Sequence, residues 1–131
     1  MTISQQVNFD CSAKQLFSIL TEAKIFSQIT ASEAVFDLCV NGEFSAFNGM
    51  ISGTYLELEK DKRLTQRWRA ANWQDGVYSL ISFHLQESTE HKTTLSFEQT
   101  EYPAEFEQHL AQGWQDRYWQ PIKKYLADNS K

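Results

Sequence analysis

The sequence is poor in residues that cross-link or interrupt a chain, with two cysteines, two prolines and five glycines among 131 residues. Cys11 and Cys39 have neither CxxC spacing nor a companion cluster of histidines, which argues against a zinc site. Two buried, reduced thiols are a simpler expectation than a disulfide. Because no repeat, linker or low-complexity segment divides the chain, we expect a single domain over residues 1–131.

Long hydrophobic runs are also missing from the sequence. No apolar stretch approaches the ~20 residues that a membrane span requires. The N-terminal segment MTISQQVNFD lacks the basic and apolar regions of a secretory signal. We therefore expect a cytoplasmic protein with no membrane span. The formal net charge of −5 argues against nucleic acid or an anionic membrane as the main partner.

The motifs of several common enzyme classes are absent as well. The sequence contains no P-loop, no GxGxxG fingerprint, no GxSxG elbow and no HExxH zinc motif. The three histidines, His84, His91 and His109, are scattered over expected strands and a helix, which disfavours shared metal ligation. We therefore expect neither a cofactor nor a bound metal.

Aromatic side chains, by contrast, are abundant: nine Phe, five Tyr and four Trp make up 14% of the chain. A core or pocket built largely from rings is expected. The inward polar positions that strand alternation predicts are Gln66, Ser79 and Gln99, and none is a good general base at neutral pH. Catalysis is therefore the least favoured function.

The first thirty residues predict one strand followed by two short helices. Apolar and polar residues alternate over 2–10, as in a half-buried strand. Ser12 can accept a hydrogen bond from a free amide of the first helical turn, so it predicts the N-cap of a helix over 13–22. A second short helix is expected around 23–30.

Residues 33–100 predict one strand after another, separated by short turns. The dipeptides Asn41-Gly42 and Asp75-Gly76 are typical of tight turns between strands. Consecutive strands joined by short turns form an antiparallel meander. The expected segments are 36–40, 44–46, 50–59, 63–70, 77–87 and 92–100.

The remainder, from Pro103 to about Ala127, predicts one long helix with apolar residues at three- to four-residue spacing. Gly113 and Pro121 both lower helix propensity inside it. Pro121 also removes one backbone donor, so we expect a bend near 117–121. The whole pattern predicts an α+β fold in which a curved antiparallel sheet of six to seven strands wraps around this helix.

The Arg-Trp-Arg sequence within strand 63–70 needs a strand register before its side chains can be placed. Pairing Leu58 with Leu64 gives a five-residue turn between the two strands. Leu56, Leu58, Leu64 and Trp68 then share the inner face of the sheet. Trp68 is therefore expected to be a core residue or the wall of a pocket.

The same register places Tyr55, Arg67 and Arg69 on the outer face. Tyr55 then lies opposite Arg67, which allows an exposed cation–π contact. Both arginines are expected to be exposed. A solvated strand face is the preferred interpretation, and a surface that docks a partner is the alternative.

Three segments resemble a known family: GMISGTYLELEKDKRLTQRWRAANWQDGVYS, TTLSFEQTEYP and GWQDRYW. They are similar to the C-terminal domain of the activator of heat-shock protein 90 ATPase. Its bacterial single-domain relatives belong to the START-like (SRPBCC) helix-grip superfamily. The shared features are Trp68-Arg69, Trp73, Tyr78-Ser79, Pro103 and Gly113-Trp114.

This resemblance implies a helix-grip domain with a hydrophobic cavity between the sheet and the last helix. In eukaryotic members it implies assistance to the ATPase cycle of a chaperone, and in some superfamily members the binding of lipids, sterols or polyketides. The chain shows no counterpart of the separate N-terminal domain with which such activators make much of their chaperone contact.

The function expected first is non-enzymatic binding of a small apolar ligand. The alternative is an interaction module for a chaperone of the heat-shock protein 90 class, which would use Arg67 and Arg69. A third hypothesis is a cyclase- or hydrolase-like activity in the same cavity. The expected ligand walls are Phe36, Leu56, Leu58, Trp68, Ile81, Phe83, Leu95, Phe97, Trp114 and Tyr118.

Overall fold

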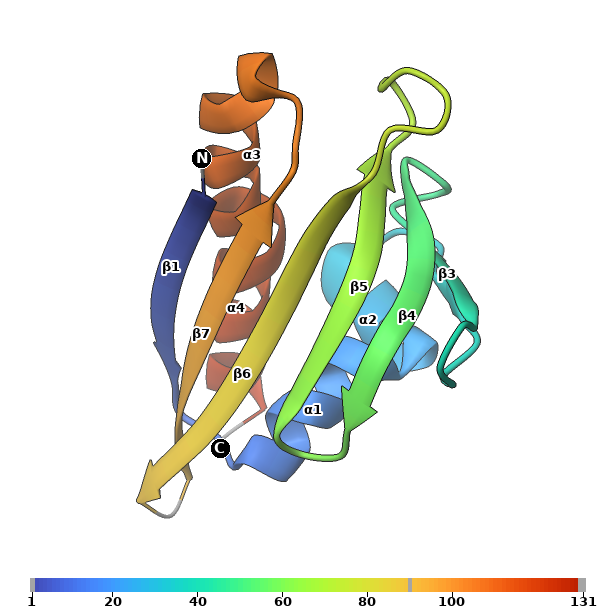
Figure 1. Cartoon of the computed structure of the whole chain (residues 1–131). Helices are drawn as coiled ribbons and strands as arrows, with labels where there is room; N and C mark the ends of the chain where they lie inside the picture. Colours follow the sequence, from blue (N-terminus) through green and yellow to red (C-terminus); the bar gives the residue numbers. More distant parts are fainter. Residues whose placement is uncertain (1, 90, 130–131) are drawn as a thin grey trace.

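The computed structural model describes residues 2–89 and 91–129. Seven strands form one antiparallel sheet in the order β1-β7-β6-β5-β4-β3-β2 (Figure 1). Strands β2 to β7 follow one another as a meander, and β1 joins its free edge beside β7. The strands are β1 (Thr2–Phe9), β2 (Val35–Phe36), β3 (Glu43–Ala46), β4 (Ile51–Glu59), β5 (Arg63–Ala70), β6 (Ser79–Thr89) and β7 (Lys92–Thr100).

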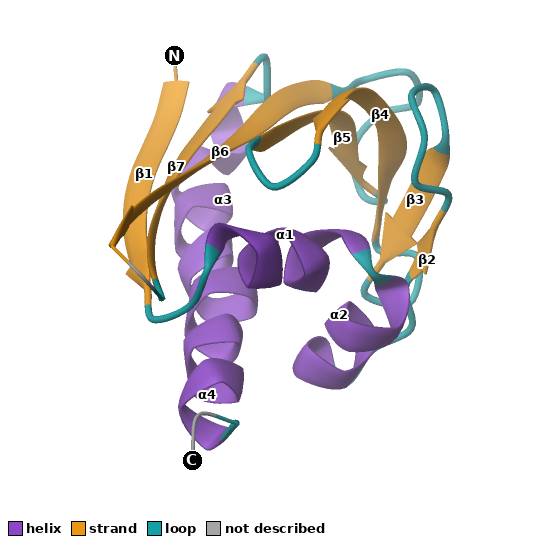
Figure 2. Ribbon diagram, turned by 90° about the horizontal axis from the view of Figure 1, so that it is seen from below, coloured by secondary structure: helices purple, strands orange, loops and turns teal. Residues whose placement is uncertain are grey.

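Two short helices follow β1, as the sequence predicts: α1 (Ala13–Thr21) and α2 (Ala23–Thr30). The Ser12 hydroxyl accepts a 3.1 Å hydrogen bond from the Gln15 amide, which confirms the expected N-cap. Figure 2 shows both helices on the concave side of the curved sheet, next to the C-terminal helix. The helices therefore cover one face of the sheet and leave the outer face to solvent.

The C-terminal helix runs from residue 104 to residue 128, as predicted, but it is not uniform. A 3₁₀ turn (Ala104–Phe106) leads into α3 (Glu107–Trp114), a π-helical segment (Gln115–Trp119) and α4 (Gln120–Asp128). In the π-helical segment the amide of Gln120 donates to the carbonyl of Gln115, five residues back. This irregularity directly precedes Pro121, where the missing backbone donor was expected to disturb the helix.

Gln5 of β1 stabilises the irregular part of this helix. The Gln115 amide donates to the Gln112 carbonyl, which takes it away from its regular α-helical acceptor at Ala111. The Gln5 side-chain amide donates to that Ala111 carbonyl over 3.0 Å. Its oxygen accepts a 2.6 Å hydrogen bond from the Trp119 indole. One side chain thus donates to a carbonyl at the start of the irregular segment, accepts from the indole at its end, and links β1 to the helix.

The hairpin of β4 and β5 corrects part of the predicted register. Leu58 does pair with Leu64, but a β-bulge lies between Tyr55 and Glu57. The extra residue reverses the alternation beyond it. Tyr55 is therefore fully buried, whereas Leu56 lies on the outer face beside Leu80.

The segment expected as strand 36–40 is also different, because only Val35–Phe36 is strand. The Cys39 amide donates to the Asp37 carbonyl, and the Cys39 carbonyl accepts from the Gly42 amide, so the backbone of Cys39 itself bonds within turns and not in the sheet. Cys39 is consequently exposed, contrary to the expectation of two buried thiols, while Cys11 is buried.

Candidate functional site

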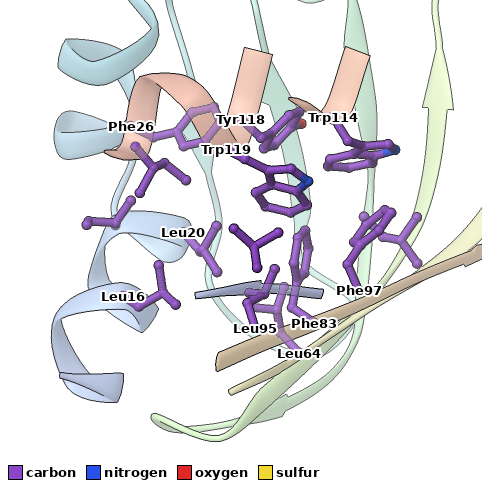
Figure 3. Packing of buried hydrophobic residues seen from close by; sticks show 14 of the residues in the cluster. Leu16, Leu20, Phe26, Leu64, Phe83, Leu95, Phe97, Trp114, Tyr118 and Trp119 are labelled. Atoms are coloured by element: carbon purple, nitrogen blue, oxygen red, sulfur yellow. The ribbon is translucent and has the colours of Figure 1, made fainter. Parts of the chain in front are cut away.

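The centre of the space between sheet and helix is filled by aromatic rings (Figure 3). The ring centres of Phe97 and Trp114 lie 4.2 Å apart, and so do those of Trp114 and Tyr118. Trp114 also stacks on Trp119 at 5.7 Å, because a π-helical turn brings residues five apart onto one face. These packed side chains therefore fill most of the space in which the resemblance implies a hydrophobic cavity.

The residues expected to wall a ligand site fall into three groups. Ile81, Phe83, Leu95 and Phe97 are buried in the packed centre. Phe36 and Leu58 are partly buried at its margin, and Leu56 lies on the outer face as described above. The three that line an open pocket are Trp68, Trp114 and Tyr118.

This pocket has a volume of about 180 Å³ and lies at one end of the sheet, between the β5–β6 loop and α3. Drug-sized ligands occupy pockets of ~300–1,000 Å³, so this one suits only a compact group. Its walls combine aliphatic residues such as Ile51 and Leu110 with six aromatic rings. The six are Phe47, Trp68, Trp73, Phe106, Trp114 and Tyr118.

The absence of a side chain at Gly113 helps to keep this end open. Gly113 lines the pocket from α3, and a Cβ atom built on it would meet nothing within 4 Å. Large residues lie nearby on the helix, Leu110 one turn before Gly113 and Trp114 directly after it, and both are buried. The sequence predicts that Gly113 lowers helix stability and shows Gly113-Trp114 as part of the family resemblance, but it does not predict the space beside Gly113.

Trp73 forms the opposite wall and is held in place by Arg69. The Arg69 guanidinium donates to the Trp73 carbonyl over 2.8 Å and to the Gln74 carbonyl over 3.0 Å. The indole of Trp73 is 5.6 Å from that of Trp68 and stacks over Phe106 at 6.3 Å. Arg69 is half-buried as a result, so the expectation that both arginines are exposed holds only for Arg67.

A chain of buried hydrogen bonds connects the helix to the sheet behind the pocket. The Trp114 indole donates to the Gln99 oxygen over 2.9 Å, and the Gln99 amide donates to the Ser79 hydroxyl over 3.0 Å. Ser79 in turn donates to the Trp68 carbonyl over 2.9 Å. The inward positions predicted for Gln99 and Ser79 are confirmed, and so is that of Gln66.

Two buried phenols lie near the packed centre. Burial raises the pKa of Tyr55 well above its usual range, and its hydroxyl has no hydrogen-bond partner among the described residues. Burial also raises the pKa of Tyr118, against the opposing effects of the Trp68 indole and the Arg117 charge. The Trp68 N–H is close enough to favour the Tyr118 anion but makes no hydrogen bond of good geometry. Both phenols are therefore neutral near pH 7.

The outer face of the sheet carries a different cluster, which we call the outer patch: Arg67, Arg69, Tyr78 and Leu80. Each guanidinium carbon lies 5.7 Å from the centre of the Tyr78 ring. The aromatic partner of Arg67 is thus Tyr78 and not Tyr55, because the bulge turns Tyr55 inward. Tyr78 is 41% exposed and Leu80 38% exposed. Within residues 2–89 and 91–129, neither arginine forms an ion pair with a carboxylate.

The architecture is a helix-grip fold, in which a curved antiparallel sheet encloses a long C-terminal helix. The sequence matches the model of the family described as "Activator of Hsp90 ATPase homolog 1-like protein" over residues 10–127, and the chain belongs to this family. This confirms the resemblance found in the sequence.

Curated relatives agree with this family. The chain is 29% identical to the mouse "Activator of 90 kDa heat shock protein ATPase homolog 2" over 90% of its length, and 26% identical to the human homolog 1 over 93%. An uncharacterized protein of Schizosaccharomyces pombe is 30% identical over 92% of the chain. The chain spans 35–36% of the length of these relatives.

Solved structures support the fold. An HSP90 activator from Plasmodium falciparum superposes with a TM-score of 0.91 at 24% identity, covering 97% of this chain and 96% of that one. The Aha1 dimer from Colwellia psychrerythraea superposes with a TM-score of 0.80 at 18% identity, with 96% of each chain covered. No helix in the described part of the chain is long and apolar enough to cross a membrane.

Proposed function

We propose that this domain is an interaction module that acts on a chaperone of the heat-shock protein 90 class. The observation that carries the proposal is the family match over residues 10–127, together with relatives named as activators of that chaperone's ATPase. The packed centre adds support, because a domain that grips a lipid or sterol needs a larger space than about 180 Å³.

The outer patch is the surface that we propose for this contact. It combines two cationic groups, an exposed tyrosine and an exposed leucine, the mixture of residue types that interfaces favour. Its arginines lack acidic partners in the described chain, although acidic residues exceed basic ones, 17 to 12. A local positive patch on an acidic domain suits an acidic surface of the partner and orients the encounter.

The test measures the ATPase rate of a purified chaperone of this class, from the same organism, with and without the domain. Arg67→Glu reverses a charge whose side chain makes no hydrogen bond to the residues that the structure describes, and we expect about tenfold weaker binding from lost complementarity. Lys123→Glu makes the same charge change on the exposed side of α4 and should leave affinity within about twofold. A chaperone that neither binds the domain nor changes its ATPase rate would overturn the proposal.

Binding of a small apolar ligand is the second candidate function. The specific observation that favours it is the aromatic pocket between the β5–β6 loop and α3. Because the volume is small, the ligand would have to be compact, not a lipid, sterol or polyketide. Saturable binding of a small aromatic compound, seen at the indole resonances of Trp68 and Trp73, tests this candidate.

A further inference from the structure

The mouth of the aromatic pocket has a distinct chemical character. The exposed polar residues that line it are Asn72, His109 and Arg117, and no aspartate or glutamate contributes to the lining. All three side chains can donate hydrogen bonds, and Arg117 carries a permanent positive charge. The opening is therefore positive or neutral, although the chain as a whole has a net charge of −5.

Arg117 is placed so that its charge acts within the pocket. Its guanidinium carbon lies 6.0 Å from the centre of the Phe47 ring, another lining residue. Burial raises the pKa of the Tyr118 hydroxyl, and the Arg117 charge acts against this rise, as expected for a guanidinium beside the pocket wall. No carboxylate pairs with Arg117 in the residues that the structure describes, so its donors are free for an anion.

The inner walls of the pocket indicate which apolar group the ligand should carry. Trp68, Trp73 and Phe106 present ring faces and edges, which favour a flat aromatic group over a flexible chain. The volume of about 180 Å³ limits that group to one or two rings. The Trp68 N–H is buried and donates no hydrogen bond of good geometry to any residue between 2 and 89 or between 91 and 129.

We infer that the pocket binds a compact aromatic carboxylate, with its ring between Trp68, Trp73 and Phe106 and its carboxylate at Arg117 and His109. This inference deepens the second candidate function, since it names the chemical class of the ligand. It does not require chaperone binding by the outer patch on the other face of the sheet, although one residue of that patch, Arg69, also holds the pocket wall Trp73.

The experiment titrates phenylacetate and, separately, its neutral isostere phenylacetamide into the ¹⁵N-labelled protein. The four tryptophan indole N–H resonances, assigned from single Trp→Phe variants, report where each compound binds. We expect saturable shifts at Trp68 and Trp73 and a smaller response at Trp119, which does not line the pocket. Phenylacetate should bind roughly fivefold more tightly than phenylacetamide, because only the acid forms an ion pair with Arg117.

Two variants test the location, and a third tests the charge. Gly113→Leu fills the pocket from α3, where there is room for the added side chain, and should abolish binding of both compounds. Gln108→Leu adds the same residue at an exposed position outside the pocket and should change neither affinity. Arg117→Gln should remove the advantage of the acid and leave the amide unaffected.

The possible outcomes separate this inference from the function on which it rests. If the amide binds as tightly as the acid, the carboxylate is not recognised and the inference is wrong, while apolar ligand binding stands. If neither compound gives saturable shifts at about 10 mM, or if Gly113→Leu binds both unchanged, the pocket is not a ligand site. Either of these last results overturns the inference and the second candidate together, and the chaperone ATPase measurement remains a separate test.

Discussion

The packed centre and the pocket end of this domain are closed by the same helix, yet one is full and the other is open. In the centre, the π-helical turn places Trp114 and Trp119 on one face, where they stack at 5.7 Å. At the pocket end, Gly113, the residue directly before Trp114, contributes no side chain. Trp114 contacts both regions, since its ring centre is also 5.4 Å from that of Trp68. In this domain, a few positions of the last helix thus decide which part of the space beneath the sheet is filled and which is open.

The largest effect on stability is expected when one ring in each region is replaced by alanine and the two losses are compared. Phe97 is 1% exposed and lies 4.2 Å from Trp114 and 5.5 Å from Trp119, between ring centres. Phe97→Ala should lower the free energy of unfolding by ~3–5 kcal/mol, because it leaves a cavity that the packed centre cannot close. Phe106→Ala, at the pocket wall, should cost less than half as much. Urea unfolding measures both, and equal losses would contradict the comparison.

The next largest loss of stability is expected from breaking the chain of buried hydrogen bonds behind the pocket. Gln99→Met keeps the approximate shape but leaves the Trp114 N–H without its acceptor at 2.9 Å and removes the donor to Ser79. We expect a loss of ~1–3 kcal/mol from the unsatisfied buried groups. Gln86→Met makes the same replacement at an exposed position of β6 and should stay within about 0.5 kcal/mol. A loss for Gln99→Met no larger than for Gln86→Met would show that the chain of hydrogen bonds adds nothing to stability.

Most of the fold could be predicted because each strand and helix follows from its own apolar period. Strand alternation correctly predicted that Trp68, Ser79 and Gln99 face inward. Pro121 correctly indicated where the last helix is irregular. The bulge could not be predicted, because Tyr55 and Leu56 are both apolar enough to face the core and local sequence does not choose between them.

The candidate site was harder to predict than the fold. Trp68, Trp114 and Tyr118 were named as walls, but Phe83 and Phe97 were named with them for the same reason, inward parity. Parity says which way a side chain points and does not say whether the space in front of it is filled. That depends on rings from distant parts of the chain meeting in three dimensions, as the indoles of Trp68 and Trp114 do.

A smaller effect is the pH dependence of stability that the buried Cys11 thiol causes. Burial, followed by the charges of Asp10 and Glu87, raises the pKa of the Cys11 thiol from 9.0 to about 11. Above pH 9 the unfolded chain loses this proton while the folded chain keeps it, so stability is complete below pH 9 and falls as pH rises towards 11. The free energy of unfolding, measured at pH 8 and at pH 10, should decrease less between the two for Cys11→Ser than for the unsubstituted protein. The contributions of the tyrosines are retained in both. An equal decrease in both proteins would mean that the thiol is not desolvated.

The smallest expected change is a gain in stability, and it tests the open pocket end directly. Gly113→Ala places a methyl group where nothing lies within 4 Å, and it removes the conformational freedom of glycine from the unfolded chain. We expect the free energy of unfolding to rise by ~0.4–1 kcal/mol, the usual gain at a helical site that accepts the new side chain. Thermal and urea unfolding would both record it. Because the pocket has only about 180 Å³, the same methyl group should also weaken the binding of phenylacetate, so stability and ligand affinity move in opposite directions. A loss of stability would mean that the pocket end is as tightly packed as the centre, and the contrast between the two regions would disappear.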